Sequence, residues 1–144
     1  MGFELNQKVR ELQPYPPITG DYEVRLDANE SFLAPYDGLK DQIMQQLNEV
    51  LLNRYPDPYA QKVCDLFAQF YGLNPAFVTA GNGSDELISV LVNTFMQKGD
   101  TALVLAPDFS MYAFYLHLAE CRCITFQKEP DFTFSIDRFL EVVN

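Results

Sequence analysis

Residues 79–88, TAGNGSDELI, place two glycines and a serine where an extended run passes into an apolar-periodic helix. Gly81 and Gly83 permit tight backbone with positive φ and the close approach of a ligand. The N–H groups near Gly83, Ser84 and Asp85 are expected to be unsatisfied donors at a helix N-terminus, where the macrodipole favours an anion. The Ser84 hydroxyl can add one more hydrogen bond. The pattern therefore predicts a phosphate-binding loop.

The same stretch also fits a plain loop that binds nothing. In that interpretation Ser84 is a helix N-cap, and Asp85 and Glu86 complement the positive end of the helix dipole. Two familiar phosphate loops are excluded: a dinucleotide fingerprint needs a third glycine where Glu86 stands, and a nucleotide P-loop needs Gly-Lys-Ser/Thr. The loop residues by themselves leave both interpretations open.

Aromatic side chains mark a second strand end, in residues 106–112, APDFSMY. Phe109 comes just after the predicted strand, and Tyr112 lies about one helical turn further on. An aromatic face at this place suits a flat ring as a ligand, but it equally suits filling of the core.

Two prolines stiffen the segment RYPDP, residues 54–58. They restrict Tyr55 and Asp57 to extended backbone, because the residue before a proline is disfavoured in the helical region. Such a loop can hold the Tyr55 phenol outward to reach another group, or it can simply end a helix.

The hydrophobic pattern predicts the elements that position these groups. Strands are expected at 76–80, 101–106 and 121–127, and helices at 3–12, 39–52, 59–71, 84–97, 110–119 and 135–143. Asp37 and Ser135 are expected N-caps, and Gly72 a C-cap. Apolar stripes on the helices, including Val63, Leu66, Phe67 and Phe70, are expected to face inward. Alternation of strands and helices from residue 76 onward predicts an α/β fold with a parallel sheet, which binds ligands beyond the carboxyl ends of its strands.

The composition excludes several classes of function. The net charge of −10 argues against nucleic acid and anionic membranes as partners, because both require a basic face. No apolar run is long enough to span a bilayer, and the N-terminus carries charges where a signal peptide has its apolar core, so a cytoplasmic protein is expected. Cys64, Cys121 and Cys123 are expected to be reduced and apolar, with no metal site, and His117 to serve packing.

Four motifs occur in order, namely LDANES (26–31), RYPD (54–57), AGNGSDELI (80–88) and PDFSMY (107–112). The series resembles the N-terminal part of the histidinol-phosphate aminotransferases, fold-type-I enzymes that use pyridoxal 5′-phosphate. The resemblance covers residues 10–144. It implies an N-terminal arm and irregular segment over 1–38, followed by a partial cofactor-binding α/β domain with an incomplete parallel sheet over 39–144. Threonine-phosphate decarboxylase-like relatives share much of the series.

The resemblance also implies roles for individual residues on the cofactor side. The backbone at Gly83, Ser84 and Asp85 is expected to bind the cofactor phosphate. Phe109 is expected to stack on the pyridine ring. The substrate implied is a small amino-acid phosphate.

Three further residues take roles from the same resemblance. Tyr55 is expected to reach across a homodimer interface to the phosphate of the neighbouring subunit. Tyr15 and Asn29 are expected to shape the substrate side of the pocket.

The resemblance places the remaining chemical groups later in the chain, beyond residue 144. These are the Schiff-base lysine, the aspartate that pairs with the pyridine nitrogen, and the arginines that clamp the substrate carboxylate. The lysines present are expected to be surface positions: Lys8, Lys40, Lys62, Lys98 and Lys128. We therefore expect the chain alone to lack transaminase activity. Three functions follow: a segment of a histidinol-phosphate aminotransferase, a catalytically inactive module that binds a phosphorylated ligand or a partner, and a decarboxylase-like relative.

Overall fold

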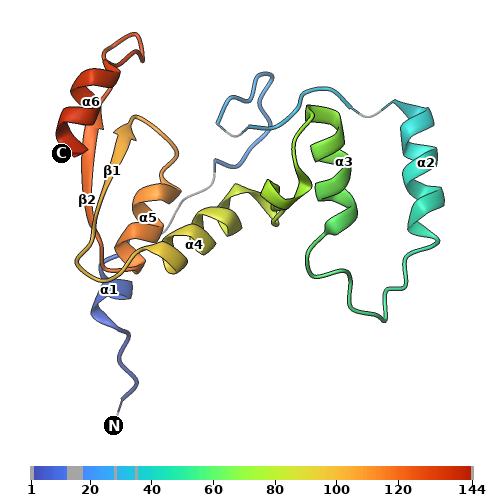
Figure 1. Cartoon of the computed structure of the whole chain (residues 1–144), viewed down its shortest axis with the longest axis horizontal. Coiled ribbons are helices and arrows are strands. Elements are labelled where there is room, and N and C mark those ends of the chain that lie inside the picture. The colour runs from blue at the N-terminus through green and yellow to red at the C-terminus, as the bar shows by residue number, and fades with distance from the viewer. Residues whose placement is uncertain (1, 13–17, 28, 35, 144) are drawn as a thin grey trace.

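The computed structural model describes residues 2–12, 18–27, 29–34 and 36–143 (Figure 1). Its elements, in chain order, are α1 (Gln7–Arg10), α2 (Asp37–Leu47), α3 (Gln61–Tyr71), the 3₁₀ turn η1 (Pro75–Phe77), α4 (Gly83–Phe95), β1 (Thr101–Ala106), α5 (Met111–Leu118), β2 (Arg122–Gln127) and α6 (Ile136–Val143). None of the helices in this described part is both long and apolar enough to cross a membrane.

Two parallel strands form the sheet, as the alternating pattern predicts. β1 pairs with β2 in a register that sets Thr101 opposite Arg122 and Ala106 opposite Gln127. The strands expected at 101–106 and 121–127 are thereby confirmed, the second beginning one residue later. α5 connects them, as a parallel pair requires a crossover connection.

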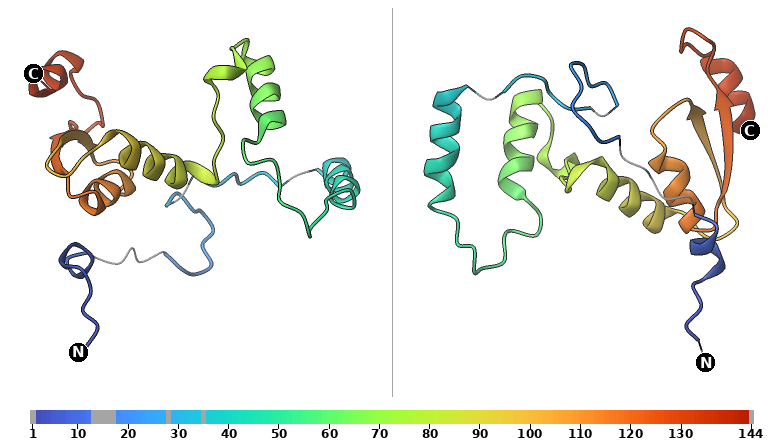
Figure 2. Two further views of the ribbon diagram at one scale, coloured as in Figure 1. Left: turned by 60° about the horizontal axis from the view of Figure 1, so that its bottom comes forward. Right: turned by 180° about the vertical axis from the view of Figure 1, so that it is seen from behind.

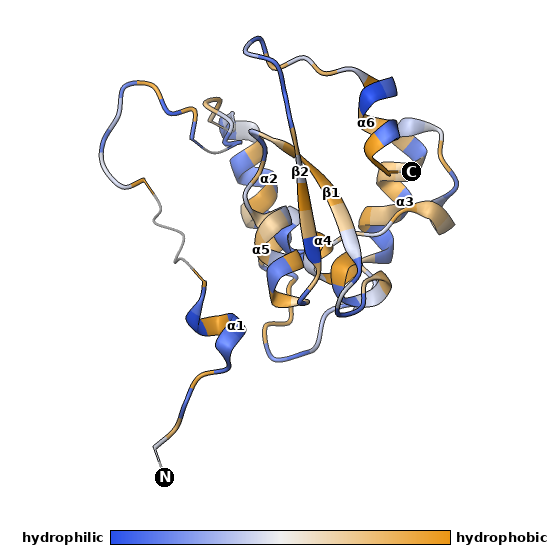
Figure 3. Cartoon of the chain, turned by 90° about the vertical axis from the view of Figure 1, so that its left-hand side faces the viewer, coloured by the Kyte–Doolittle hydropathy of each residue, from blue (hydrophilic) through white to orange (hydrophobic). Residues whose placement is uncertain are grey.

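The core lies where α4 and α5 meet one face of the sheet (Figure 1). Ile88 and Val92 of α4 and Leu116 of α5 are buried there, with Ala102 and Val104 of β1 packed against them. The middle of each strand beside this core consists mainly of hydrophobic residues (Figure 3). The helical spacing of Ile88 and Val92, four residues apart, is what places both side chains on the face of α4 that meets α5.

α2 and α3 lie away from the sheet in every view (Figures 1 and 2). The expectation that Val63, Leu66, Phe67 and Phe70 face inward is wrong for the described chain, because each of them is exposed. Only Cys64 and Ala68 of α3 are buried. The periodicity correctly predicted an amphipathic helix, but it contains no information about which surface covers the apolar side.

A strand expected at 76–80 does not form. Residues Pro75–Phe77 make a 3₁₀ turn, which Asn74 caps by accepting a hydrogen bond from the Ala76 N–H at 3.0 Å. Val78, which follows, has extended backbone, but no described segment lies beside it as a strand. A β-strand requires a neighbour for its N–H and C=O groups, so β-prone composition alone does not produce one.

The helix ends agree with the caps expected from sequence in two of three cases. Gly72 ends α3 in the left-handed conformation, with φ 66°, and the Ser135 hydroxyl accepts a hydrogen bond from the Arg138 N–H at 3.3 Å. Asp37 is not an N-cap, because α2 begins at Asp37 itself and its carboxylate pairs with Lys40 at 3.3 Å.

Candidate functional site

The loop before α4 has a backbone shape that only glycine adopts readily. Gly83 has φ +82°, and its N–H donates to Gly81 O at 2.9 Å. Gly81 is required for a different reason, since a Cβ there would come 2.9 Å from Leu87 Cγ and Cδ2. The Glu86 carboxylate accepts hydrogen bonds from the Asn82 N–H at 2.5 Å and from Asn82 Nδ2 at 3.2 Å. Glu86 thus stabilises the loop from inside the helix, in the manner of a capping box.

The N–H groups that follow this turn remain available. Within the described residues, neither the Ser84 N–H nor the Asp85 N–H donates a hydrogen bond to the protein. Both lie in the first turn of α4, where the partial positive charge of the helix favours an anion. The Oδ1 atom of Asp85 is enclosed and accepts no hydrogen bond from the described part of the chain. The two free donors match the phosphate-binding interpretation of the sequence.

A cavity of 770 Å³ has Ser84 in its lining. Three separate segments contribute to its lining: the arm at residues 25–27, 29 and 30, the N-terminus of α4, and the loop after β1. The lining residues are Arg25, Leu26, Asp27, Asn29, Glu30, Ser84 and Phe109. The fold therefore brings together Asn29, Ser84 and Phe109, three residues that sequence reasoning selected from three different motifs. Gly83 and Asp85 flank Ser84 along the chain.

The charged part of the lining comes from residues that sequence reasoning missed. Arg25 lies 3.4 Å from Asp27 Oδ2 and 3.7 Å from Glu30 Oε2. The hydrogen bond from Arg25 holds the pKa of Asp27 below its usual range, and the same contact raises the pKa of Arg25. The signal was present, because these residues belong to or adjoin LDANES, from which only Asn29 was selected.

Phe109 forms the aromatic wall of the cavity. Its ring packs edge-on against Tyr112, with centroids 6.1 Å apart and an interplanar angle of 89°. The residue is 45% exposed, so part of its surface remains accessible to a ligand. An exposed aromatic face beside free anion donors is the combination that a flat phosphorylated ring requires.

Two predicted residues lie outside this arrangement. Tyr55 lies in the connection between α2 and α3, is fully exposed, and does not line the cavity. Its expected role across a subunit interface remains a prediction. Tyr15 falls outside the described residues.

The lysines and the histidine mostly occupy peripheral places. No lysine is among the described residues that line the cavity. Lys128 is the more enclosed case: its side chain is 17% exposed, and it pairs with Asp108 at 3.3 Å. His117 Nε2 lies 2.8 Å from Lys8 O and holds α1 against the end of α5, which is a packing role.

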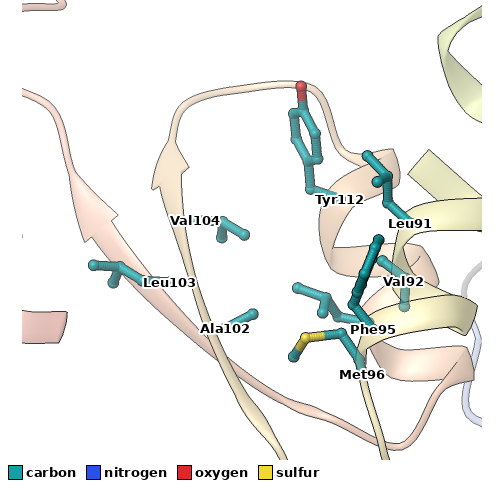
Figure 4. Close-up of a pocket in the computed structure, with 9 residues that line it drawn as sticks. Leu91, Val92, Phe95, Met96, Ala102, Leu103, Val104 and Tyr112 are labelled. Carbon is teal, nitrogen blue, oxygen red and sulfur yellow. The ribbon is translucent and has the colours of Figure 1, made fainter. Parts of the chain in front are cut away.

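A second cavity, of 300 Å³, lies between α4, α5 and β1 (Figure 4). Leu91, Val92, Phe95, Met96 and Tyr112 surround it together with side chains of β1, and no charged residue lines it. Apart from the Tyr112 side chain its described lining is apolar, so it is a less suitable site for a phosphate than the cavity beside Ser84.

Comparison with known proteins identifies the family. The family model for aminotransferase class I and II matches residues 22–144. The chain belongs to this family. The match contains α4 with its N-terminal loop and every residue that lines the larger cavity.

Individual aminotransferases and their structural relatives agree with this assignment. A histidinol-phosphate aminotransferase of Clostridium kluyveri is 37% identical over 140 residues, which are 97% of this chain and 40% of that protein. The crystal structure of a histidinol-phosphate aminotransferase from Sinorhizobium meliloti, in complex with pyridoxal-5′-phosphate, matches at a TM-score of 0.78 with 19% identity. It covers 96% of this chain and 39% of that one. An L-threonine-O-3-phosphate decarboxylase of Porphyromonas gingivalis matches at 0.58 with 18% identity, over 69% of this chain and 31% of that one.

These likenesses confirm the aminotransferase fold and its partial extent. The chain spans about 40% of the length of the first relatives that it matches. The predicted fold class, the N-terminal portion of the fold-type-I aminotransferase fold, is confirmed in that form.

Proposed function

We propose that this chain contributes the phosphate and ring subsites for pyridoxal 5′-phosphate in an aminotransferase that acts on histidinol phosphate. One observation supports this most directly: a single cavity joins the Ser84 loop and Phe109 in a chain of this family. The relatives named for that reaction, matched along almost the whole chain, support the substrate. The reaction converts histidinol phosphate and 2-oxoglutarate to imidazole acetol phosphate and glutamate.

The phosphate subsite consists of Gly83, Ser84 and Asp85. The Ser84 and Asp85 N–H groups donate to phosphate oxygens, and they follow directly on the turn that the positive φ of Gly83 makes. Charge-assisted hydrogen bonds of this kind are about twice as strong as neutral ones. These donors give affinity and orientation, and no proton transfer is required of them.

The ring subsite is the exposed face of Phe109. When bound, the cofactor supplies the electron sink for reactions at the carbon that carries the amino group. Phe109 packs against the flat ring and excludes water from one side of it. Asn29, on the facing arm, provides an amide that can donate to or accept from the substrate.

The roles of Tyr15 and Tyr55 extend this proposal. Tyr55, held outward on its proline-flanked loop, is proposed to donate to the cofactor phosphate of a second subunit in a homodimer. Tyr15 is proposed to line the substrate side. The division into an arm over 1–38 and a cofactor domain over 39–144, and a cytoplasmic location, belong to the same proposal.

A second candidate is binding of a phosphorylated ligand or partner without chemistry by this chain. It is favoured by the lining of the cavity, which contains anion donors and no lysine among the described residues. A threonine-phosphate decarboxylase-like reaction is a third candidate, for which the support is a shared fold. All three candidates predict the same phosphate subsite.

A binding experiment tests the subsite. Pyridoxine 5′-phosphate is the probe, because it has no aldehyde and cannot form an adventitious imine with surface lysines. We expect it to bind the purified chain in calorimetry, and pyridoxine without the phosphate to bind far more weakly. Equal affinity for the two would refute the phosphate subsite.

Two substitutions at one position separate the backbone donor from the hydroxyl. Ser84→Pro removes the N–H, and proline is tolerated in the first helical turn. Ser84→Ala removes only the hydroxyl. We expect Ser84→Pro to weaken binding of pyridoxine 5′-phosphate more than tenfold, as for a lost hydrogen bond to a charged group worth about 1.5–3 kcal/mol, and Ser84→Ala to weaken it less.

An activity assay separates the first candidate from the second. The chain is mixed with pyridoxal 5′-phosphate, histidinol phosphate and 2-oxoglutarate, and glutamate is measured. We expect no multiple turnovers from this polypeptide alone. Turnover that disappears in Ser84→Pro would show that a lysine of this chain is catalytic.

A further inference from the structure

An ion pair lies directly behind the aromatic wall of the cavity. Lys128, which follows β2, donates from Nζ to Asp108 Oδ2 at 3.3 Å, and Asp108 follows β1. The other carboxylate oxygen, Asp108 Oδ1, accepts a hydrogen bond from the Phe109 N–H at 2.7 Å. One carboxylate therefore connects the end of β2 to the backbone of the residue that lines the cavity.

The backbone of Lys128 is hydrogen-bonded to the sheet. The Lys128 N–H donates to Ala106 O at 2.8 Å and continues the ladder beyond the last paired residues of β1 and β2. The Lys128 side chain is 17% exposed, whereas Lys98, in its own ion pair with Glu120, is 75% exposed. The Lys128 side chain is thus more enclosed than that of Lys98, with Asp108 as its counter-ion.

The Phe109 side chain is only partly enclosed by the protein. The residue is 45% exposed, and its ring meets Tyr112 edge-on, at 6.1 Å between centroids. The placement of its backbone therefore helps to set where the ring lies. The hydrogen bond from the Phe109 N–H also lowers the pKa of Asp108, and Lys128 adds to that effect, so the carboxylate stays charged at neutral pH.

We infer that Asp108 and Lys128 are positioning residues that hold Phe109 where a flat ring stacks against it. They act through the Phe109 backbone and do not line the cavity themselves. Stacking requires the ring to stay close to its partner, since a radial gap of about 0.5–1 Å already forfeits a quarter to a half of the dispersion attraction. The identity of the stacked ring rests on the proposed function, but the positioning of Phe109 does not.

A fluorescent reporter tests the positioning without any ligand. The chain contains no tryptophan, so Phe109→Trp introduces a single indole at the cavity wall. In that background we compare Lys128→Met, Asp108→Asn and Lys128→Arg with the matched control Lys98→Met, which removes an exposed ion pair elsewhere. We expect Lys128→Met and Asp108→Asn to lower the indole anisotropy and to increase acrylamide quenching. Lys128→Arg and Lys98→Met are expected to leave both unchanged.

A binding measurement then tests whether the positioning of Phe109 affects ligand affinity. With Phe109 intact, Lys128→Met is expected to weaken pyridoxine 5′-phosphate binding about three- to fivefold, or about 0.6–1 kcal/mol, and Lys128→Arg to restore it. If pyridoxine 5′-phosphate does not bind the unchanged chain, the proposed function fails, while the indole anisotropy still decides the positioning.

Equal anisotropy in Lys128→Met and Lys98→Met would overturn the inference. Should Lys128→Met lose far-UV ellipticity, the exchanged pair Asp108→Lys with Lys128→Asp decides in its place. Recovery of the anisotropy in that double variant, relative to either single change, supports the ion pair, and no recovery overturns it.

Discussion

Gly83→Ala isolates the backbone geometry of the phosphate subsite from every side-chain effect. Gly83 has φ +82°, and a Cβ built there meets no atom within 4 Å. The change therefore adds no steric clash, and its cost is that of alanine in left-handed backbone, about 1–2 kcal/mol. Relief of this strain requires rotation of the two peptide units that flank Gly83, one of which carries the Ser84 N–H. A change that strains the backbone at Gly83 is therefore expected to displace the N–H donors of the phosphate subsite.

Gly72→Ala is the matched control for this prediction. Gly72 ends α3 with φ +66°, and it too has open space around an added Cβ. Alanine at Gly72 carries the same backbone strain at a place that does not line the cavity. We expect both variants to lower the free energy of unfolding by about 1–2 kcal/mol, measured by urea denaturation.

The binding measurement distinguishes the two variants. Gly83→Ala is expected to weaken pyridoxine 5′-phosphate more than tenfold, because a displaced N–H forfeits a charge-assisted hydrogen bond worth about 1.5–3 kcal/mol. Gly72→Ala is expected to leave the affinity unchanged. Asparagine adopts left-handed backbone more readily than alanine, so Gly83→Asn should recover part of the loss. Equal affinity in Gly83→Ala and Gly72→Ala would refute the assignment of the loop as the phosphate subsite.

Three further predictions concern other parts of the molecule. Tyr55→Phe is expected to leave binding by the isolated chain unchanged but to weaken cofactor retention by about 1–3 kcal/mol in a dimeric aminotransferase that contains this segment, measured by cofactor titration; equal retention would remove Tyr55 from the site. The pKa of Asp108 is lowered by the Phe109 N–H and Lys128, so its contribution to stability is present above the usual aspartate range and is lost as pH falls through the lowered value. The indole of the Phe109→Trp variant should therefore lose anisotropy on acidification through this lowered pKa, and Asp108→Asn should abolish that transition. The exposed apolar stripe of α2 should make the chain associate into species larger than the 16.5 kDa monomer in sedimentation, and Ile43→Glu with Leu47→Glu should reduce that association. An unchanged distribution of species would show that this face of α2 does not mediate the association.

The strand and helix periods along the chain determined much of the local structure in advance. TALVLA forms β1 over the predicted residues, because a continuous apolar run between turn residues suits a strand covered on its faces. The left-handed φ of Gly83 and of Gly72 was also predictable, since glycine is the residue that adopts that conformation without strain. These features depend on neighbours in the chain, which the sequence displays directly.

The pairing of strands and the burial of an apolar helix face, by contrast, depend on residues distant in the chain. Residues 76–80 are β-prone but form no strand, because strand formation requires a partner for the backbone hydrogen bonds. Phe67 and Phe70 lie on a periodic apolar stripe and are exposed, because periodicity defines a face without defining what packs on it. Local pattern is therefore a sound guide to an element and a poor guide to its surroundings.

The same division holds for the candidate site. The residue types of the GNGSDE loop, and a resemblance carried by four motifs, selected Asn29, Ser84 and Phe109 from sequence alone. Only the tertiary structure showed that these three residues line one cavity and that Arg25 with its two carboxylate partners lines it as well. It also showed that Lys128 pairs with Asp108, the residue before Phe109. The physical reason is distance along the chain. Conformational preference and charge belong to a residue and its neighbours. A cavity, or an ion pair across 20 residues, exists only once the strands and helices have brought distant residues together.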